Sequence, residues 1–463
     1  MRAPLIALGV LLVVNACRSD ELATEGHLLV YVDTDAPLPR AGRRASPLEP
    51  MPLVDTVRIE LLTTEGDPAC ASCSREFSLD EEDVNAGATF TVLAREARKA
   101  VLHATAFRAV TVRSGLPGAR IEVWSRVPAP PREGARPMTL RLPMDAFGRP
   151  LGSLAAPVDL LEGPPARPRI VWRRAERRPC TGEPPPGAVC VPGGAFWMGG
   201  PDDPAFASFL SPRVVTLSPF FVDRTEVTVR AYRETSGDDP RATPWSGSLA
   251  GTRQEDFCTF TREPGRFEDH PVNCIDWADA RAHCIRRGGD LLSEAQREYV
   301  ASALNGLPYV WGFDPPGCAD AVLALGPQTE RFSRTIAGFD TGCRRRVPPF
   351  DPELDAIGFS RPVGVPHGRD VLELPGGAVH DLAGNMVEWV RDDWQPRSGP
   401  CWTSPEIAHD PVCSSDPTAG RTLRGASWIS PLATADAWLR QEFPAHPGIT
   451  GIGIGIRCVY PSR

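Results

Sequence analysis

The stretch "HDLAGNMVEWVRDDW", residues 380–394, decides how the second half of this 463-residue chain is interpreted. It places three aspartates, one glutamate and two tryptophans around a Gly-Asn pair. Carboxylates next to turn-forming residues suit a hard cation, whereas large aromatic side chains anchor a loop by burial. The stretch therefore raises three possibilities: a catalytic site, a metal site or a structural loop.

The chain around this stretch is long enough for at least two domains, because single cores stop growing at roughly 250 to 300 residues. Its 42% hydrophobic and 23% charged residues support globular folding, while 50 prolines and 42 glycines predict many turns and little helix. A formal charge of -8 would repel a phosphate backbone, so we expect no nucleic-acid partner. All basic residues except Lys99 are arginines, to which we attach no function at this point.

The N-terminus is typical of an exported protein. Residues 1–16 predict a lipoprotein signal peptide, with Arg2 before an apolar run, residues 5–14, that is too short to span a bilayer. Ala16 directly before Cys17 resembles a bacterial lipobox, in which Cys17 becomes the lipidated first residue and residues 17–26 form a tether. The alternative is a plain secretory signal with a chance cysteine. The lipobox predicts a membrane partner through the lipid, in the cell envelope, facing the periplasm or the exterior.

Export lets the twelve remaining cysteines, an even number, form disulfides. We expect Cys70 and Cys73 to close a small structural loop and not to act in redox chemistry. Sequence alone leaves the connectivity open. Proximity makes four further pairs plausible: Cys180 with Cys190, Cys258 with Cys274, Cys318 with Cys343, and Cys401 with Cys413.

Residues 27–160 predict a small, all-β, antiparallel sandwich, because several strand-length segments alternate apolar and polar residues between Gly, Pro and Asp clusters. These segments are "HLLVYV", "VRIELL", "ATFTVLA", "AVLHATAF", "RIEVWSRV" and "MTLRL". Residues 161–189 are rich in Pro and Arg and indicate a linker.

Residues 190–463 form the predicted second domain, which is rich in loops and aromatic residues. One helix is expected in "DWADARAHCIRRG", where Trp277, Ala280 and Cys284 recur at helical spacing. A second helix is expected in "SEAQREYVASAL", where Ser293 and Gln296 have the spacing of a capping box.

The motifs of the second domain occur in an order that resembles the formylglycine-generating enzyme, or sulfatase-modifying factor, domain family. They include "VPGGAFWMGG" (191–200), "HPVNCIDWADARAHC" (270–284), "LLSEAQREYVA" (291–301), "YVWG" (309–312), "VHDLAGNMVEWVRDDW" (379–394), "LRGASW" (423–428) and "GIRCV" (455–459). The resemblance implies an α+β, C-type-lectin-like fold with many loops and few helices. It also implies a disulfide between Cys284 and Cys458.

Calcium is the cofactor that the resemblance implies at the opening stretch, since Ca²⁺ takes six to eight oxygen ligands. The implied ligands are the side chains of Asp381 and Glu388 and the carbonyls of Gly384 and Met386. The alternative is that Asp381 and Glu388 cap turns and pair with Arg391 or Arg424. A second implied site consists of Asp320, the Ala321 carbonyl, Asp355 and the Ile357 carbonyl.

The oxidases of this family bind copper through two cysteines just after the "RGGSW" element. Here the segment reads "LRGASWISPLATADAW", with Ser430 and Ala435 at those two positions. Because soft thiolates select Cu(I), a hydroxyl and a methyl group cannot replace them. We therefore expect neither a copper centre nor a catalytic residue of that kind. The eight histidines also lack metal-ligand spacing.

These observations predict an exported lipoprotein whose second domain binds a glycan, a peptide or an envelope protein and does not catalyse a reaction. One alternative is an enzyme, either an oxidoreductase of the formylglycine-generating type or one that uses other residues of the same cleft. Another alternative is a structural spacer.

Overall fold

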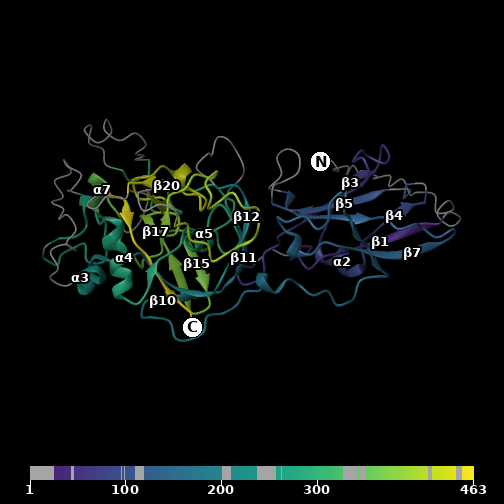
Figure 1. Cartoon of the computed structure of the whole chain (residues 1–463). Coiled ribbons are helices and arrows are strands. Elements are labelled where there is room, and N and C mark those ends of the chain that lie inside the picture. The colour runs from purple at the N-terminus through teal and green to yellow at the C-terminus, as the bar shows by residue number, and fades with distance from the viewer. Residues whose placement is uncertain are drawn as a thin grey trace, which may run out of the picture.

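The computed structural model of the chain describes residues 26–42, 46–94, 96–97, 100–109, 119–200, 210–236, 257–261, 263–326, 342–343, 351–414, 420–444 and 451–462. They form a β-rich N-terminal domain and a larger mixed domain that lie side by side (Figure 1). The predicted signal peptide and Cys17 lie outside the described residues. No helix in these ranges has both the length and the apolar character needed to cross a membrane.

The first domain is a sandwich of two sheets, with strand orders β4-β1-β7-β9 and β3-β2-β5-β6-β8. Burial alternates residue by residue along β1 and β2, and their buried sides share one core. The elements are β1 (His27–Asp33), β2 (Thr56–Leu62), β3 (Ser74–Ser78), α2 (Glu81–Ala86), β4 (Thr89–Leu93), β5 (Val101–Phe107), β6 (Ile121–Arg126), β7 (Ala135–Arg141), a 3-10 turn (Met144–Ala146), β8 (Val158–Asp159) and β9 (Leu161–Glu162).

All six segments predicted as strands are strands, but the sandwich is not purely antiparallel. Strand β1 pairs parallel with β7, and β6 pairs parallel with β8. Alternation of apolar and polar residues shows which side of a strand is buried and does not show the direction of its neighbour. The prediction of antiparallel pairing was therefore wrong at these two places.

The second domain combines short strands with a few helices, as its loop-rich sequence predicts. Its sheets have the strand orders β10-β13-β22-β14, β11-β12-β18, β15-β16 and β20-β19-β17-β21. The elements are a 3-10 turn (Arg173–Ala175), β10 (Ala188–Val191), β11 (Gly194–Met198), β12 (Arg213–Leu217), β13 (Phe220–Asp223), α3 (Val229–Ser236), α4 (Trp277–Arg286), β14 (Asp290–Leu291), α5 (Glu294–Ala301), α7 (Pro352–Ile357), β15 (Val371–Leu374), β16 (Gly377–His380), β17 (Val387–Asp393), β18 (Ala408–His409), β19 (Arg421–Arg424), a 3-10 turn (Leu432–Thr434), β20 (Arg440–Phe443), β21 (Ile454–Gly455) and β22 (Cys458–Pro461).

Both predicted helices are present and begin at side-chain caps. The Asp276 carboxylate accepts from Asp279 N at 2.9 Å at the start of α4. At the start of α5, Ser293 Oγ accepts from Gln296 N at 3.1 Å and Gln296 Oε1 accepts from Ser293 N at 2.9 Å. These bonds satisfy N–H groups that have no partner within the helix.

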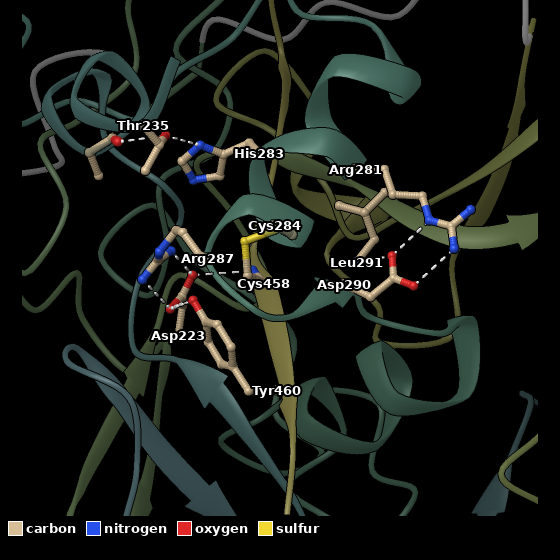
Figure 2. The surroundings of a disulfide bond; sticks show 11 residues. Asp223, Thr235, Arg281, His283, Cys284, Arg287, Asp290, Leu291, Cys458 and Tyr460 are labelled. Atoms are coloured by element: carbon tan, nitrogen blue, oxygen red, sulfur yellow. Dashed lines mark hydrogen bonds and ion pairs between the residues drawn. A yellow bond between two sulfur atoms is a disulfide. The ribbon is translucent and has the colours of Figure 1, made fainter. Parts of the chain in front are cut away.

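A disulfide between Cys284 and Cys458 joins α4 to β22, which is the pairing that the resemblance implied (Figure 2). Next to it, the Asp223 carboxylate accepts from Arg287 Nη1 at 2.7 Å and from Tyr460 Oη at 3.0 Å. The other disulfides are Cys70–Cys73, Cys180–Cys190, Cys258–Cys274, Cys318–Cys343 and Cys401–Cys413.

The segment between the domains is packed against both of them. Arg177 Nε donates to Pro47 O of the first domain at 3.1 Å, and Arg177 Nη1 donates to Tyr299 Oη of the second at 2.8 Å. Trp197 Nε1 also donates across the junction, to Leu53 O at 3.2 Å. Residues 161–189 therefore include a docked connection and are not wholly an extended spacer.

Candidate functional site

The loop before β17 is a tight turn between two left-handed residues. Asp381 and Asn385 have φ angles of 56° and 65°. A Cβ on Gly384 would lie 2.8 Å from Val322 O, so this position requires glycine because another backbone approaches it closely. The reversal of the chain is therefore made by Asp381 and Asn385, whose φ angles are positive.

A carboxylate that sequence reasoning missed holds this loop. Asp370 is fully buried and accepts backbone N–H bonds from Leu382 and Ala383 at 2.9 Å and from Gly384 at 3.0 Å. Burial raises the pKa of Asp370 to about 6, although the three N–H groups act in the opposite direction. No motif marks Asp370, because it belongs to a turn that approaches the loop only in the folded chain.

Asp381 lies beside Glu226, a carboxyl group that the sequence did not indicate. Asp381 Oδ1 is 2.7 Å from His367 Nδ1, and the side chains of Asp381 and His367 are fully buried. Burial raises the pKa of Glu226 well above its usual value, and the charge of Asp381 raises it further. Burial also raises the pKa of Asp381, with Asp370 adding to the effect. Within the described residues, neither carboxyl oxygen of Glu226 has a hydrogen-bond partner.

Glu388 lies between two arginines at the start of β17. Its Oε2 accepts from Arg297 Nε at 2.5 Å, its Oε1 accepts from Arg457 Nε at 3.0 Å, and all three side chains are at most 1% exposed. We call these three residues the Glu388 cluster. The pairing alternative to calcium named other arginines, and these lie elsewhere: Arg391 is 3.4 Å from Asp290, and Arg424 pairs with Glu294 and Glu298.

The second implied calcium site is also occupied by arginines. Asp320 accepts from Arg369 Nε at 2.7 Å and from Arg369 Nη2 at 3.0 Å, and Asp355 forms a buried ion pair with Arg361. Ala321 is buried, and Ile357 ends α7. The described residues contain no group of three or more His, Cys, Asp or Glu side chains that could hold a metal ion. As arranged here, the residues of the two implied sites do not fit Ca²⁺.

Ser430 and Ala435, which the resemblance places at the two copper-ligand positions, lie near the end of the domain. Ser430 Oγ is 3.1 Å from Ser427 Oγ and accepts from Ser427 N at 3.0 Å. Ala435 is 2% exposed and packs in a small cluster with Ala321, Leu323, Ala383 and Ala426. The twelve cysteines of the described residues are all in disulfides, so none of them provides a thiol.

A half-buried surface with an aromatic pair and one acidic group lies next to these positions. The rings of Tyr309 and Trp311 stack with centroids 5.1 Å apart at an interplanar angle of 3°. Burial raises the pKa of Asp436 to about 6, and within the described residues no basic side chain pairs with its carboxylate. We call the residues Tyr309, Trp311, Ser430, Leu432 and Asp436 the Ser430 surface. The "YVWG" motif contains its aromatic pair, but the sequence reasoning gave that pair no role, and nothing in the sequence pointed to Asp436.

Buried ion pairs position the chain next to Asp436. Arg424 pairs with Glu294 and Glu298 of α5, and its Nη2 donates to Ala437 O at 2.9 Å. Arg424 Nη1 also donates to Trp438 O at 3.2 Å. A carboxyl group that titrates near pH 6 beside an aromatic face can accept hydrogen bonds from a ligand whose apolar side packs on the ring.

Comparison with known proteins gives this arrangement a family. A model of the sulfatase-modifying factor enzyme 1-like domain matches residues 174–461. The "Formylglycine-generating enzyme" of Thermomonospora curvata is 27% identical over 275 residues, which cover 52% of this chain and 82% of that protein. The "Inactive C-alpha-formylglycine-generating enzyme 2" of Mus musculus is 27% identical over 310 residues, which cover 59% of this chain and 85% of that protein.

A solved structure, PvdO from Pseudomonas aeruginosa, is 21% identical and covers 59% of this chain and 93% of its own, with a TM-score of 0.37. The family match spans well over half of the chain and begins in the segment that docks between the two domains. This chain belongs to the family of proteins with a sulfatase-modifying factor enzyme 1-like domain.

Proposed function

We propose that this chain is a non-catalytic, exported lipoprotein that binds a ligand at the Ser430 surface. The observation that carries the proposal is the pair of side chains at the family's copper positions. Ser430 is hydrogen-bonded to Ser427, and Ala435 is buried among alanines and offers no ligand atom. Because Cu(I) is held by soft sulfur ligands, this pair cannot assemble the oxygen-activating centre.

The relatives of this chain include both enzymes and proteins named as inactive. The family includes the bacterial enzyme from Thermomonospora curvata and mammalian proteins named as inactive, and this chain is 27% identical to each kind. Overall similarity therefore does not separate an enzyme from a non-enzyme here. The residues at the two copper positions do, and they favour the non-catalytic function.

Three features support binding as the function. The Tyr309–Trp311 pair presents aromatic surface, and Arg369 lies over Trp311 with its guanidinium carbon 5.2 Å from the ring centroid. Asp436 provides an acceptor without a basic partner among the described residues. The surrounding segments are loops, which a disulfide-linked scaffold can hold in place for recognition. The ligand is a glycan, a peptide or an envelope protein.

The disulfides also support the proposed location. Six disulfides form in an oxidising compartment and are rare in the cytosol. With lipidation at Cys17, the protein would be held in the cell envelope and face the periplasm or the exterior. Labelling cells with a lipid precursor tests this step, because a Cys17→Ser variant should lose the label.

The test of the non-catalytic function is oxygen consumption by the copper-treated protein with a sulfatase-type Cys-x-Pro-x-Arg peptide. We expect no turnover and no thiolate-bound copper, while the Thermomonospora curvata enzyme serves as the positive control. Turnover of the peptide by this chain, with or without copper, would contradict the proposal.

The test of binding compares three variants on glycan and peptide arrays and in envelope extracts. Trp311→Ala and Asp436→Asn should each weaken binding at least about tenfold, the effect of losing one buried contact at an interface. Ile285→Ala is the matched control, because Ile285 is 54% exposed on α4 and lies outside the Ser430 surface. Equal binding by all three variants would place the ligand elsewhere on the protein.

A further inference from the structure

We propose that arginine side chains stand in place of both calcium ions that the family resemblance implies, so that this domain folds independently of calcium. Four carboxylates were expected to bind the ions: Asp320, Asp355, Asp381 and Glu388. Three of them form ion pairs with arginines, and Asp381 is in contact with His367. The inference concerns the scaffold and does not depend on the proposed ligand-binding function.

Arg297 contacts one of the implied calcium ligands, Glu388, and a neighbouring carbonyl of the same loop, Leu382 O. Its Nε donates to the carboxylate of Glu388 at 2.5 Å, and its Nη2 donates to the carbonyl of Leu382 at 2.9 Å. A carboxylate and a loop carbonyl are the two kinds of oxygen ligand that Ca²⁺ uses in proteins. One buried guanidinium group therefore joins β17 to the 381–386 loop. A calcium ion bound by Glu388 and the loop would join the same two segments.

Arg457 supplies a second positive charge to the same loop. Its Nε donates to Glu388 at 3.0 Å, and its Nη2 donates to His380 O at 2.8 Å and to Asp381 O at 3.3 Å. Arg457 is fully buried and comes directly before the disulfide-bonded Cys458. Both oxygens of Glu388 are thus hydrogen-bonded to guanidinium groups that the fold holds in place.

The second implied site shows the same replacement, with one buried pair and one partly exposed pair. Arg361 pairs with Asp355, and both side chains are at most 4% exposed. Arg369 donates to both oxygens of Asp320, with side chains 39% and 18% exposed. Planar guanidinium groups suit this role, because they bind carboxylates through two parallel hydrogen bonds.

Electrostatic repulsion disfavours the binding of both kinds of cation together at these oxygens. A calcium ion lies about 2.3 to 2.6 Å from its oxygen ligands, while the guanidinium nitrogens already lie 2.5 to 3.0 Å from Glu388. The two cations would then lie within about 5 Å of each other among side chains that are at most 1% exposed, where repulsion is less screened than in bulk solvent. The arginines therefore disfavour Ca²⁺ at these oxygens.

Thermal unfolding of the purified full-length protein tests the proposal, first in a calcium chelator and then in millimolar CaCl₂. We expect the two midpoints to agree within about 1 °C, because a filled site would raise the midpoint by about 5 °C or more. A rise of that size in the wild-type protein would overturn the proposal.

Two variants with equally buried arginines sharpen the test. Arg297→Gln should lower the midpoint in chelator and recover part of the loss when calcium is added. Arg424→Gln is the matched control, because Arg424 is also 1% exposed but pairs with Glu294 and Glu298, outside the implied sites. We expect this control to lose stability without any response to calcium.

Arg369→Gln provides a third arm that does not disturb the core, because the Arg369 side chain is 39% exposed. It should fold and show new calcium binding by titration calorimetry, with loss of that binding when Asp320→Asn is added. If neither Arg297→Gln nor Arg369→Gln responds to calcium, the arginines do not occupy the places of the ions.

Discussion

In the Glu388 cluster a fully buried carboxylate accepts hydrogen bonds from two guanidinium groups, whereas Asp436 on the Ser430 surface is half-buried and has no basic partner among the described residues. A paired, buried carboxylate holds chain segments together, and breaking such a pair is strongly destabilising. An unpaired carboxylate at a surface keeps its acceptor capacity for a ligand. The comparison therefore separates the part of the domain that maintains the fold from the part that can bind.

The largest expected effect concerns the Glu388 cluster. Arg297→Gln should lower the free energy of unfolding by about 3 kcal/mol, because it leaves a buried carboxylate with one partner fewer. Denaturant-induced unfolding measures this change. Arg281→Gln is the control, since Arg281 forms a surface pair with Asp290, with side chains 37% and 21% exposed, and should cost less than about 1 kcal/mol. Equal losses in the free energy of unfolding for the two variants would contradict the larger structural role of the Glu388 cluster.

On the Ser430 surface we expect a substitution to increase the free energy of unfolding, by less than the Arg297→Gln variant lowers it. Burial raises the pKa of Asp436 from 3.8 to about 6, so the folded protein binds more protons than the unfolded chain between these values and loses stability as the pH rises through them. Asp436→Asn removes this loss. At pH 7 the variant should be more stable than the wild type by about 1 kcal/mol, a value reduced for solvent exposure.

Unfolding experiments across a pH series measure this difference, which should disappear below about pH 4 because both states then bind the proton. Asp159→Asn is the matched control, because Asp159 is 76% exposed in a surface pair with Arg126 and should show no such trend. A variant that is less stable than the wild type at pH 7 would mean that Asp436 has a structural partner after all.

The smallest change in stability is expected at Asp320. Its carboxylate is paired with an arginine, like that of Glu388, but it is partly exposed, like that of Asp436. Hydrogen bonds from Arg369 lower the pKa of Asp320 despite its partial burial, so its contribution is present above the unfolded value of 3.8 and is lost as the pH falls below it. Asp320→Asn should cost less than about 1 kcal/mol at pH 7. A double-mutant cycle with Arg369→Gln measures the pair, and a coupling as large as that in the Glu388 cluster would contradict the ranking.

The positions of the regular elements could be predicted from local patterns. The six predicted strands of the first domain, the helix at Trp277 and the capping box at Ser293 depend on residues within a few positions of one another. Proximity in sequence also indicated the local disulfides, and the expectation that Ser430 and Ala435 stand at the family's two cysteine positions needed only the resemblance. The parallel partners of β1 and β6 could not be predicted, because pleat alternation is the same for both strand directions.

The partners of the buried carboxylates became visible only in the folded chain. Arg297 and Arg457 reach Glu388 from 91 and 69 residues away, and Glu226 and Asp370 come to the same loop without any motif. A carboxylate that is buried needs a partner with positive charge or hydrogen-bond donors, because an isolated charge is strongly disfavoured away from water. Whether an ion or a guanidinium group is that partner depends on which side chain the packing of distant segments brings within hydrogen-bonding distance.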